Sequence, residues 1–171
     1  MTKTLRVVLI ILAVIVAAIL IIPLFSPSTV EVTAETEVDL KPSVIFPMLA
    51  TFENREEWDP WVSTDTTAVV TIVPQPGYVG STYTWDGQRL GTGKMEVVEV
   101  TENRHIEARL WFGDTETPSR VTWDLEPVDG GTRLVWSFSQ ETSYPMERLG
   151  MMFGKSFLQR SFEFGLEQLK V

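Results

Sequence analysis

The sequence predicts an α+β fold in which an antiparallel sheet packs against one long C-terminal helix, preceded by one transmembrane helix. Three observations support this prediction. Residues 66–142 alternate between apolar and polar side chains in short runs separated by turns, which is typical of strands. Residues 145–170 repeat their apolar side chains at helical spacing, and residues 7–25 form an uncharged apolar run.

Composition excludes several classes of function. The chain has 171 residues and a formal net charge of −9, which argues against a nucleic-acid partner, because phosphates need a basic surface. It contains no cysteine, so disulfides, thiol nucleophiles and cysteine-ligated zinc are excluded. Hydrophobic residues make up 44% and charged residues 22%, an ordinary balance for a globular domain with one apolar addition.

The N-terminal run follows two positive charges, Lys3 and Arg6. It just reaches the roughly 20 apolar residues that a helix needs to cross the hydrocarbon core. We favour an uncleaved anchor over a cleaved signal, because the small-residue site at 32–34 lies inside a predicted strand. Acidic residues follow the run, so we expect a cytoplasmic N-terminus and an extracytoplasmic domain at the cell membrane. The expected division is an anchor and linker at 1–27 and a domain at 28–171.

The first elements of the domain are one strand and two short helices. Residues 29–40 alternate well and predict a strand with one wet face. Pro42 starts a helix, where its missing N–H group costs least. A second short helix is expected over 54–58, followed by Asp59, Pro60 and Trp61.

Six strands are predicted to follow, with turns between them. Asp86 and Gly87 form a hairpin turn signal, and residues 129–131 turn the chain before the last strand. Such a sheet has one apolar face that must be buried, and the C-terminal helix is the obvious cover. The predicted strands cover residues 66–73, 80–85, 90–100, 104–112, 118–127 and 133–142.

The C-terminal helix has a polar face and a broad apolar arc. Between the two edges of that arc lie Gly150, Gly154 and Gly165. Each glycine costs about 1 kcal/mol relative to alanine, so either the helix lies very close to a strand there or the space before it is open. One edge consists of Phe153, Phe157 and Phe164, and the other of Leu158, Phe162, Leu166 and Leu169.

Three local motifs add a resemblance to a known family. They are the tryptophan-rich segment Glu57-Trp58-Asp59-Pro60-Trp61, the strand entry at residues 77–85 with Gly77 and Gly80, and the final hairpin at residues 126–136. Together with the order of elements, residues 29–171 resemble the helix-grip (START-like) fold of the SRPBCC superfamily, most closely its polyketide cyclase/dehydrase-like branch. The resemblance implies a curved antiparallel sheet wrapped around the long C-terminal helix. It also implies a cavity between them, usually for an apolar or amphipathic ligand such as a lipid, sterol or polyketide.

Candidate catalytic groups are few. His105 is the only histidine, and strand alternation points it away from the apolar face. Asp124 and Glu126 share the wet face of a strand, where neighbouring carboxylates usually serve solubility. The glycine-rich segment at 91–94 is no phosphate loop, because no serine or threonine follows its lysine and no helix begins there. We therefore predict no catalytic residue, no metal ligand and no cofactor.

The aromatic residues are the remaining candidates for a site. Ligand pockets are mostly apolar with a few polar groups, and the glycines of the helix favour a cavity over a filled core. Polar groups expected at its rim are Tyr83, Arg109, Arg120 and Tyr144. The predicted ligand-binding residues are Trp58, Trp61, Tyr83, Trp85, Trp123, Trp136, Phe153 and Phe157.

Three functions remain open from the sequence. The first hypothesis is a membrane-anchored binding domain for a hydrophobic or amphipathic, lipid-like small molecule. The second is a cyclase-like or hydrolase-like enzyme, in which a carboxylate or tyrosine moves a proton. The third is an interaction module with a filled core that works through its acidic surface. The expected partners are a membrane and a hydrophobic ligand.

Overall fold

The computed structural model describes residues 2–62 and 64–170. A helix, α1 (Lys3–Ile21), continues into a short 3-10 turn, η1 (Ile22–Phe25), before the first strand. After that strand come α2 (Pro42–Ala50) and η2 (Phe52–Glu57), then six consecutive strands. The chain ends with the long helix α3 (Met146–Gln168).

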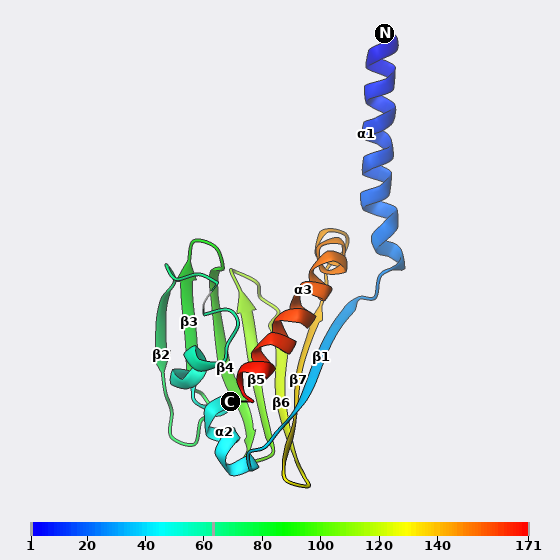
Figure 1. Cartoon of the computed structure of the whole chain (residues 1–171). Helices are drawn as coiled ribbons and strands as arrows, with labels where there is room; N and C mark the ends of the chain where they lie inside the picture. The colour runs from blue at the N-terminus through cyan, green and yellow to red at the C-terminus, as the bar shows by residue number, and fades with distance from the viewer. Residues whose placement is uncertain (1, 63, 171) are drawn as a thin grey trace.

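The strands form one antiparallel sheet of seven, in the order β1-β7-β6-β5-β4-β3-β2 (Figure 1). The predicted sheet and its α+β class are confirmed. The first strand lies at one edge because it pairs with the last, from Thr29 opposite Glu141 to Val38 opposite Thr132. The strands are β1 (Thr29–Val38), β2 (Val69–Val73), β3 (Thr82–Gly87), β4 (Gly91–Thr101), β5 (His105–Phe112), β6 (Ser119–Val128) and β7 (Gly131–Glu141).

One predicted turn is displaced. Strand β3 continues through Asp86 and Gly87, and the chain turns at residues 88–90 instead. Gly87 pairs with Gly91, so the ladder runs two residues further than the turn signal suggested. The reason lies in Gly87 itself, because a Cβ atom there would lie 2.5 Å from the Asp65 carboxylate. The glycine makes room for that side chain rather than for a tight turn.

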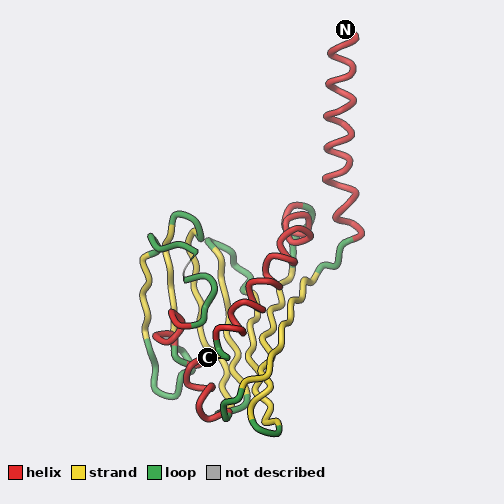
Figure 2. The backbone as a smooth tube through the Cα atoms, in the orientation of Figure 1, coloured by secondary structure: helices red, strands yellow, loops and turns green. Residues whose placement is uncertain are grey.

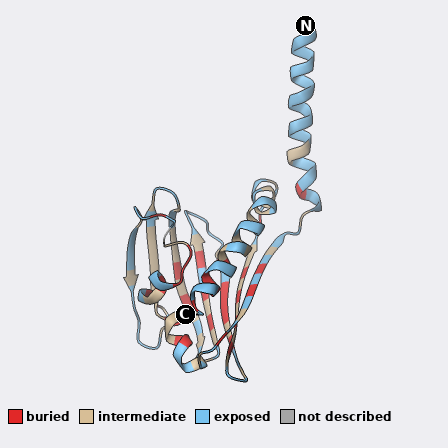
Figure 3. Cartoon of the chain, viewed as in Figure 1, coloured by how far each residue is buried: buried red, intermediate tan, exposed pale blue. Residues whose placement is uncertain are grey.

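Helix α3 crosses the concave face of the sheet and shares the core with it (Figures 1 and 2). The strands carry buried apolar residues where α3 and α2 cover the sheet, as the red bands of Figure 3 show. In α3 the buried side chains are Phe162 and Leu166, both in its C-terminal half. Helix α2 contributes Ile45, Phe46 and Leu49 at one end of the sheet. The apolar face of the sheet is therefore covered, as predicted.

Helix α1 stands apart from the sheet, and its apolar side chains are exposed (Figure 3). Together with η1 it forms the one described segment, Lys3–Phe25, that is long and apolar enough to cross a membrane, a property that signal sequences share. Hydrogen bonds tie this segment and the linker after it to the domain. Tyr144 Oη donates to Leu20 O at 2.6 Å, and Thr142 donates to Ser28 O of the linker through its N at 2.7 Å and its Oγ1 at 3.0 Å.

Candidate ligand cavity

A cavity of about 540 Å³ lies between the sheet, η2 with its following loop, and the middle of α3. Its volume is within the range of about 300–1,000 Å³ that is common for small-molecule sites. Most of its wall is apolar. Its lining residues are Arg55, Glu56, Asp59, Trp61, Val62, Asp65, Thr66, Ala68, Val70, Tyr83, Trp85, Leu90, Met95, Leu110, Phe112, Val121, Trp136, Phe138, Phe157, Leu158 and Phe162.

One wall of the cavity is a row of residues that cross four strands. Val70 pairs with Trp85, Trp85 with Gly93, and Gly93 with Phe112. The Trp85 ring lies directly over Gly93, where a Cβ atom would come within 2.0 Å of it, and meets Phe112 edge to face at 6.1 Å. Gly93, in the glycine-rich segment that carried no phosphate-loop signal, therefore makes room for an aromatic wall.

The cavity opens where its lining residues reach the surface. Phe157 of α3 lines it and is 54% exposed, and Val70 and Phe112 are also exposed. Phe157 contacts Trp61 at a ring distance of 5.6 Å across the opening. This opening lies under the middle of α3, because Phe157 is at the centre of the helix.

A buried ion pair forms the polar part of the inner wall. Arg55 Nη2 donates to Asp59 Oδ2, and both side chains are almost fully buried. Arg55 Nη1 also lies 3.0 Å from Met95 Sδ, and its guanidinium lies 5.2 Å from the centre of the Tyr83 ring. Its Nε has no hydrogen-bond partner among the described residues. A desolvated pair of this kind is costly to break, so Arg55 is held in place.

Tyr83 is the neutral polar group of the same wall. Burial raises the pKa of its hydroxyl group, although the nearby charge of Arg55 acts in the opposite direction. The tyrosine therefore stays protonated at neutral pH and can donate a hydrogen bond. Arg55 and Tyr83 together offer donors to an acceptor atom of a ligand.

Asp65 has a structural role beside the opening. Its carboxylate accepts hydrogen bonds from Thr67 Oγ1 at 2.6 Å, Arg89 N at 2.6 Å and Leu90 N at 3.2 Å. These bonds, the one from Thr67 first, lower the pKa of Asp65 from 3.8 to about 2. The ionised carboxylate thus ties the loop before β2 to the β3–β4 turn and shapes the cavity.

The far end of the cavity is closed by tightly packed aromatic rings. Phe162 stacks on Trp136 at 4.0 Å, and Trp58 meets Trp136 edge to face at 5.4 Å. A Cβ atom at Gly165 would lie 3.0 Å from both Pro60 Cδ and Trp136 Cζ3. Both explanations of the helix glycines therefore apply, since Gly165 allows close approach, and a Cβ atom at Gly150 would meet open space.

The predicted site residues separate into three groups. Trp58 and Trp123 lie in the packed core behind the cavity and are not among its lining residues. Phe153 is 77% exposed beyond the opening. The five that line the cavity are Trp61, Tyr83, Trp85, Trp136 and Phe157.

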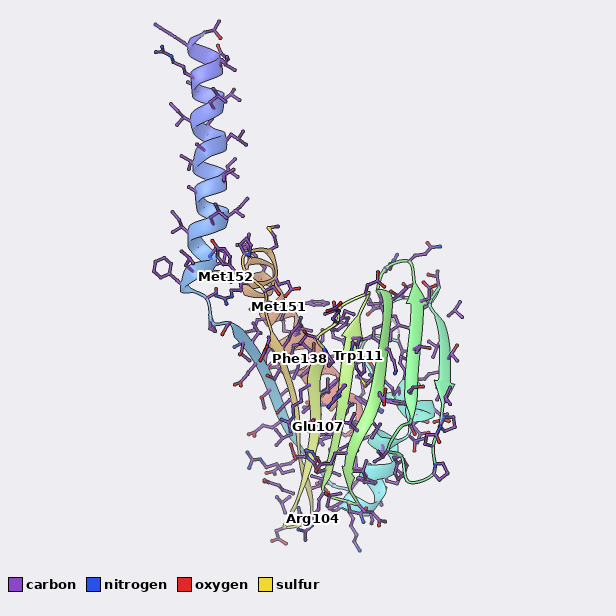
Figure 4. All side chains as sticks on the ribbon, turned by 180° about the vertical axis from the view of Figure 1, so that it is seen from behind. Arg104, Glu107, Trp111, Phe138, Met151 and Met152 are labelled. Carbon is purple, nitrogen blue, oxygen red and sulfur yellow. The ribbon has the colours of Figure 1, made fainter. Side chains whose placement is uncertain are left out.

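Of the expected rim groups, only Tyr83 lines the cavity. Arg120 pairs with Glu107 on the opposite face of the sheet, and Tyr144 binds Leu20 O. Figure 4 views the molecule from behind and labels Glu107 there. Sequence reasoning missed Arg55 as a wall residue and Asp65 as a structural one. The only available signal was the four-residue spacing of Arg55 and Asp59, which is common on exposed helices.

The candidate catalytic groups lie outside the cavity. His105 Nδ1 is 2.5 Å from Asp124 Oδ1 across β5 and β6, and both side chains are partly exposed. Neither residue lines the cavity. Among the described residues there is no group of three or more histidine, aspartate or glutamate side chains placed to hold a metal ion.

Fold and cavity together define a helix-grip domain, in which a curved sheet holds a long helix over an apolar pocket. Comparison with known families agrees. Residues 29–171 match the family described as polyketide cyclase / dehydrase and lipid transport. The chain belongs to this family, and the recognition made from its motifs is confirmed.

Solved structures share the fold at low sequence identity. The Aha1 dimer from Colwellia psychrerythraea matches with a TM-score of 0.59 and 16% identity, over 82% of this chain and 93% of that one. DynU16, from the dynemicin biosynthetic locus, matches with a TM-score of 0.58 and 14% identity, over 82% of this chain and 45% of that one. Protein Ms6760 from Mycobacterium smegmatis matches with a TM-score of 0.55 and 21% identity, over 84% of this chain and 88% of that one. No curated protein matches the sequence.

Proposed function

We propose that this chain is a membrane-anchored domain that binds a hydrophobic or amphipathic, lipid-like small molecule in the cavity under α3. Residues 1–27 would form the anchor and linker, and residues 28–171 the binding domain on the extracytoplasmic side. The observation that carries the proposal is the cavity of about 540 Å³ with its aromatic wall. Burial of apolar ligand surface at about 25 cal/mol per Å² would supply most of the affinity.

The polar groups of the inner wall favour an amphipathic ligand over a pure hydrocarbon. Arg55 and Tyr83 are donors in a mostly apolar wall. A ligand with a carbonyl or carboxylate end and an apolar body would complement these donors.

Two of the three lining carboxylates, Asp59 and Asp65, favour binding over acid–base chemistry. Asp59 is paired with Arg55 and accepts from Trp61 N at 2.9 Å. Asp65 is held ionised by its donors, the opposite of what a general acid needs. Both are occupied in holding the cavity wall, and the cavity itself argues against the interaction module with a filled core.

Native mass spectrometry of the full chain, purified from membranes in detergent, tests the proposal. We expect a discrete mass adduct that survives release from the micelle and returns when a stripped chain meets a total lipid extract. The variant Val121→Phe, in the cavity wall, should lose this adduct. The matched control Val44→Phe, at an exposed position of α2, should keep it.

Two results would overturn the proposal. One is a chain that stays free of adduct with every lipid fraction. The other is an adduct that Val121→Phe and Val44→Phe retain equally, because the bound molecule would then lie outside the cavity. Carbonate extraction of membranes tests the anchor separately, since a spanning helix resists it and a cleaved signal leaves a soluble domain.

A further inference from the structure

A set of large apolar side chains is exposed at the end of the domain where α1 joins it. Phe25 is 86% exposed, Met146 64% and Phe153 77%. Leu24 and Met152 are exposed beside them, and Figure 4 shows Met152 next to the base of α1. We refer to Leu24, Phe25, Met146, Met152 and Phe153 as the span-side patch. Scattered exposed apolar residues are ordinary, but a cluster of this kind marks an interaction surface.

The span-side patch is tied to the end of α1. Tyr144, just before α3, donates through its hydroxyl group to Leu20 O of α1, and Pro23 of η1 is buried. Only Ser26, Pro27 and Ser28 separate η1 from β1. Figures 1 and 2 both show the first turns of α3 at the height of the last turns of α1. A bilayer that held α1 would therefore meet the first turns of α3.

The opening of the cavity faces the same end of the domain. Strand β1 leaves the linker at Thr29, opposite Glu141 at the end of β7. Ser119, at the start of β6, lies at the same end of the sheet and pairs with Leu110 of β5. Strand β5 ends two residues later at Phe112, so Phe112 also lies at this end. Phe112 and Phe157 are exposed lining residues, and Phe157 lies one helical turn from Phe153. The apolar surface is thus continuous from the cavity to the patch.

We propose that the span-side patch inserts into the interface of the bilayer that carries α1, so that the cavity opens onto lipid rather than water. The occupant we assign is the bilayer, because the patch is tied to the one described segment that can span it. The net charge of −9 makes apolar insertion, not attraction to anionic headgroups, the source of binding. The inference rests on the proposed function for the anchor and for the ligand that would cross this surface.

The absence of cysteine allows a direct test on the full chain. Phe153→Cys and Phe164→Cys each carry one environment-sensitive nitrobenzoxadiazole label after reconstitution into phosphatidylcholine vesicles. The two positions are eleven residues apart, so they share one face of α3 and differ by about 16 Å along its axis. Both side chains are exposed, so neither change removes core packing. Phe164 therefore serves as a matched control.

Brominated phosphatidylcholine in the vesicles should quench the label at position 153 by about two-fold or more, since docked apolar faces lie about 5–10 Å into the bilayer. The label at position 164 should keep its emission. No quenching at either position would overturn the docking while leaving the lipid adduct of the proposed function untouched. Equal quenching at both would mean that α3 lies along the membrane, which also overturns the proposal.

A second copy of the chain is the competing occupant of the patch. It would give a label at position 153 whose emission changes with protein density and not with brominated lipid, and this result would overturn the bilayer assignment. Carbonate extraction of the same vesicles separates failure of the anchor from failure of the docking. A chain that carbonate removes has no spanning helix, and both the anchor and the inference that depends on it would then fall.

Discussion

The two halves of α3 have similar apolar spacing but opposite surroundings. In the C-terminal half, Phe162 stacks on Trp136 and Gly165 lies in contact distance of Pro60. In the N-terminal half, Phe153 is exposed and Gly154 has only Met151 of its own helix nearby. One half closes the core of the domain, and the other stands over the opening of the cavity. A helix can therefore provide a rigid attachment and an open wall within one continuous element.

The largest expected difference between the halves is in stability. Phe162→Ala should destabilise the fold by about 3–5 kcal/mol, because it removes a buried ring stacked on Trp136. Phe153→Ala should change stability by no more than about 0.5 kcal/mol, because that ring is exposed. Urea denaturation of the full chain in detergent, followed by tryptophan emission, measures both. Equal losses would contradict the division of α3 into a packed and an open half.

Substitution of the two helix glycines, Gly165 and Gly154, should also affect stability differently, by a smaller amount. Gly165→Leu should cost about 1–3 kcal/mol or more, since its first side-chain atom already meets Pro60 and Trp136 at 3.0 Å. Gly154→Leu should stabilise the helix by up to about 1 kcal/mol, because open space receives the side chain and the helical propensity improves. Thermal unfolding midpoints provide the comparison. A Gly154 variant as unstable as the Gly165 variant would mean that the N-terminal half is packed after all.

The aromatic wall opposite the open half can be displaced with one methyl-bearing residue. Gly93→Val places its Cβ where the Trp85 ring lies, so the ring must move from its position beside Phe112. We expect a cost of about 1–3 kcal/mol from overpacking. We also expect a changed near-ultraviolet circular dichroism signal and a weaker lipid adduct. Gly150→Val is the control for adding valine at a glycine, because its Cβ would meet nothing within 4 Å and its backbone is helical.

The smallest expected effect is a change in the stability of the fold at low pH, caused by Asp65 in the cavity wall. The pKa of Asp65 falls from 3.8 to about 2 on folding, so its carboxylate stabilises the fold fully above about pH 4. This stabilisation should be lost as the pH falls through the folded pKa of about 2. Unfolding midpoints measured between those pH values should fall more steeply in the wild type than in Asp65→Asn. Parallel slopes would show that the hydrogen bonds of Asp65 do not hold the loop.

The periodicity of apolar residues was enough to predict the main secondary-structure elements and their packing from the sequence. Strand alternation and the helical spacing of 145–170 identified the sheet and its cover, and the motifs identified the family. Gly165 and Gly150 were recognised as meaningful, but only the structure separates close approach from open space. A pattern records which face is apolar, and it does not record how near the neighbouring element lies.

The inner wall of the cavity was harder to predict. Arg55 lies in the short helix η2 and Asp59 in the loop after it. Their four-residue spacing suggests an exposed pair, and their burial depends on Met95 and Tyr83 far along the chain. The sequence does not distinguish Trp61, which lines the cavity, from Trp58 and Trp123, which do not. Aromatic residues fill cores and line pockets equally well, so residue type alone cannot separate the two roles.

Hydrogen exchange along α3, measured by mass spectrometry on the full chain, tests whether a ligand binds beneath the helix. The lipid-stripped chain is compared with the same chain after addition of a total lipid extract. We expect peptides covering residues 153–162, which include the lining residues Phe157, Leu158 and Phe162, to gain protection with lipid, while those covering 163–168 are protected in both states. Lipid-independent exchange in 153–162, or a change confined to 163–168, would contradict a ligand cavity beneath the middle of α3.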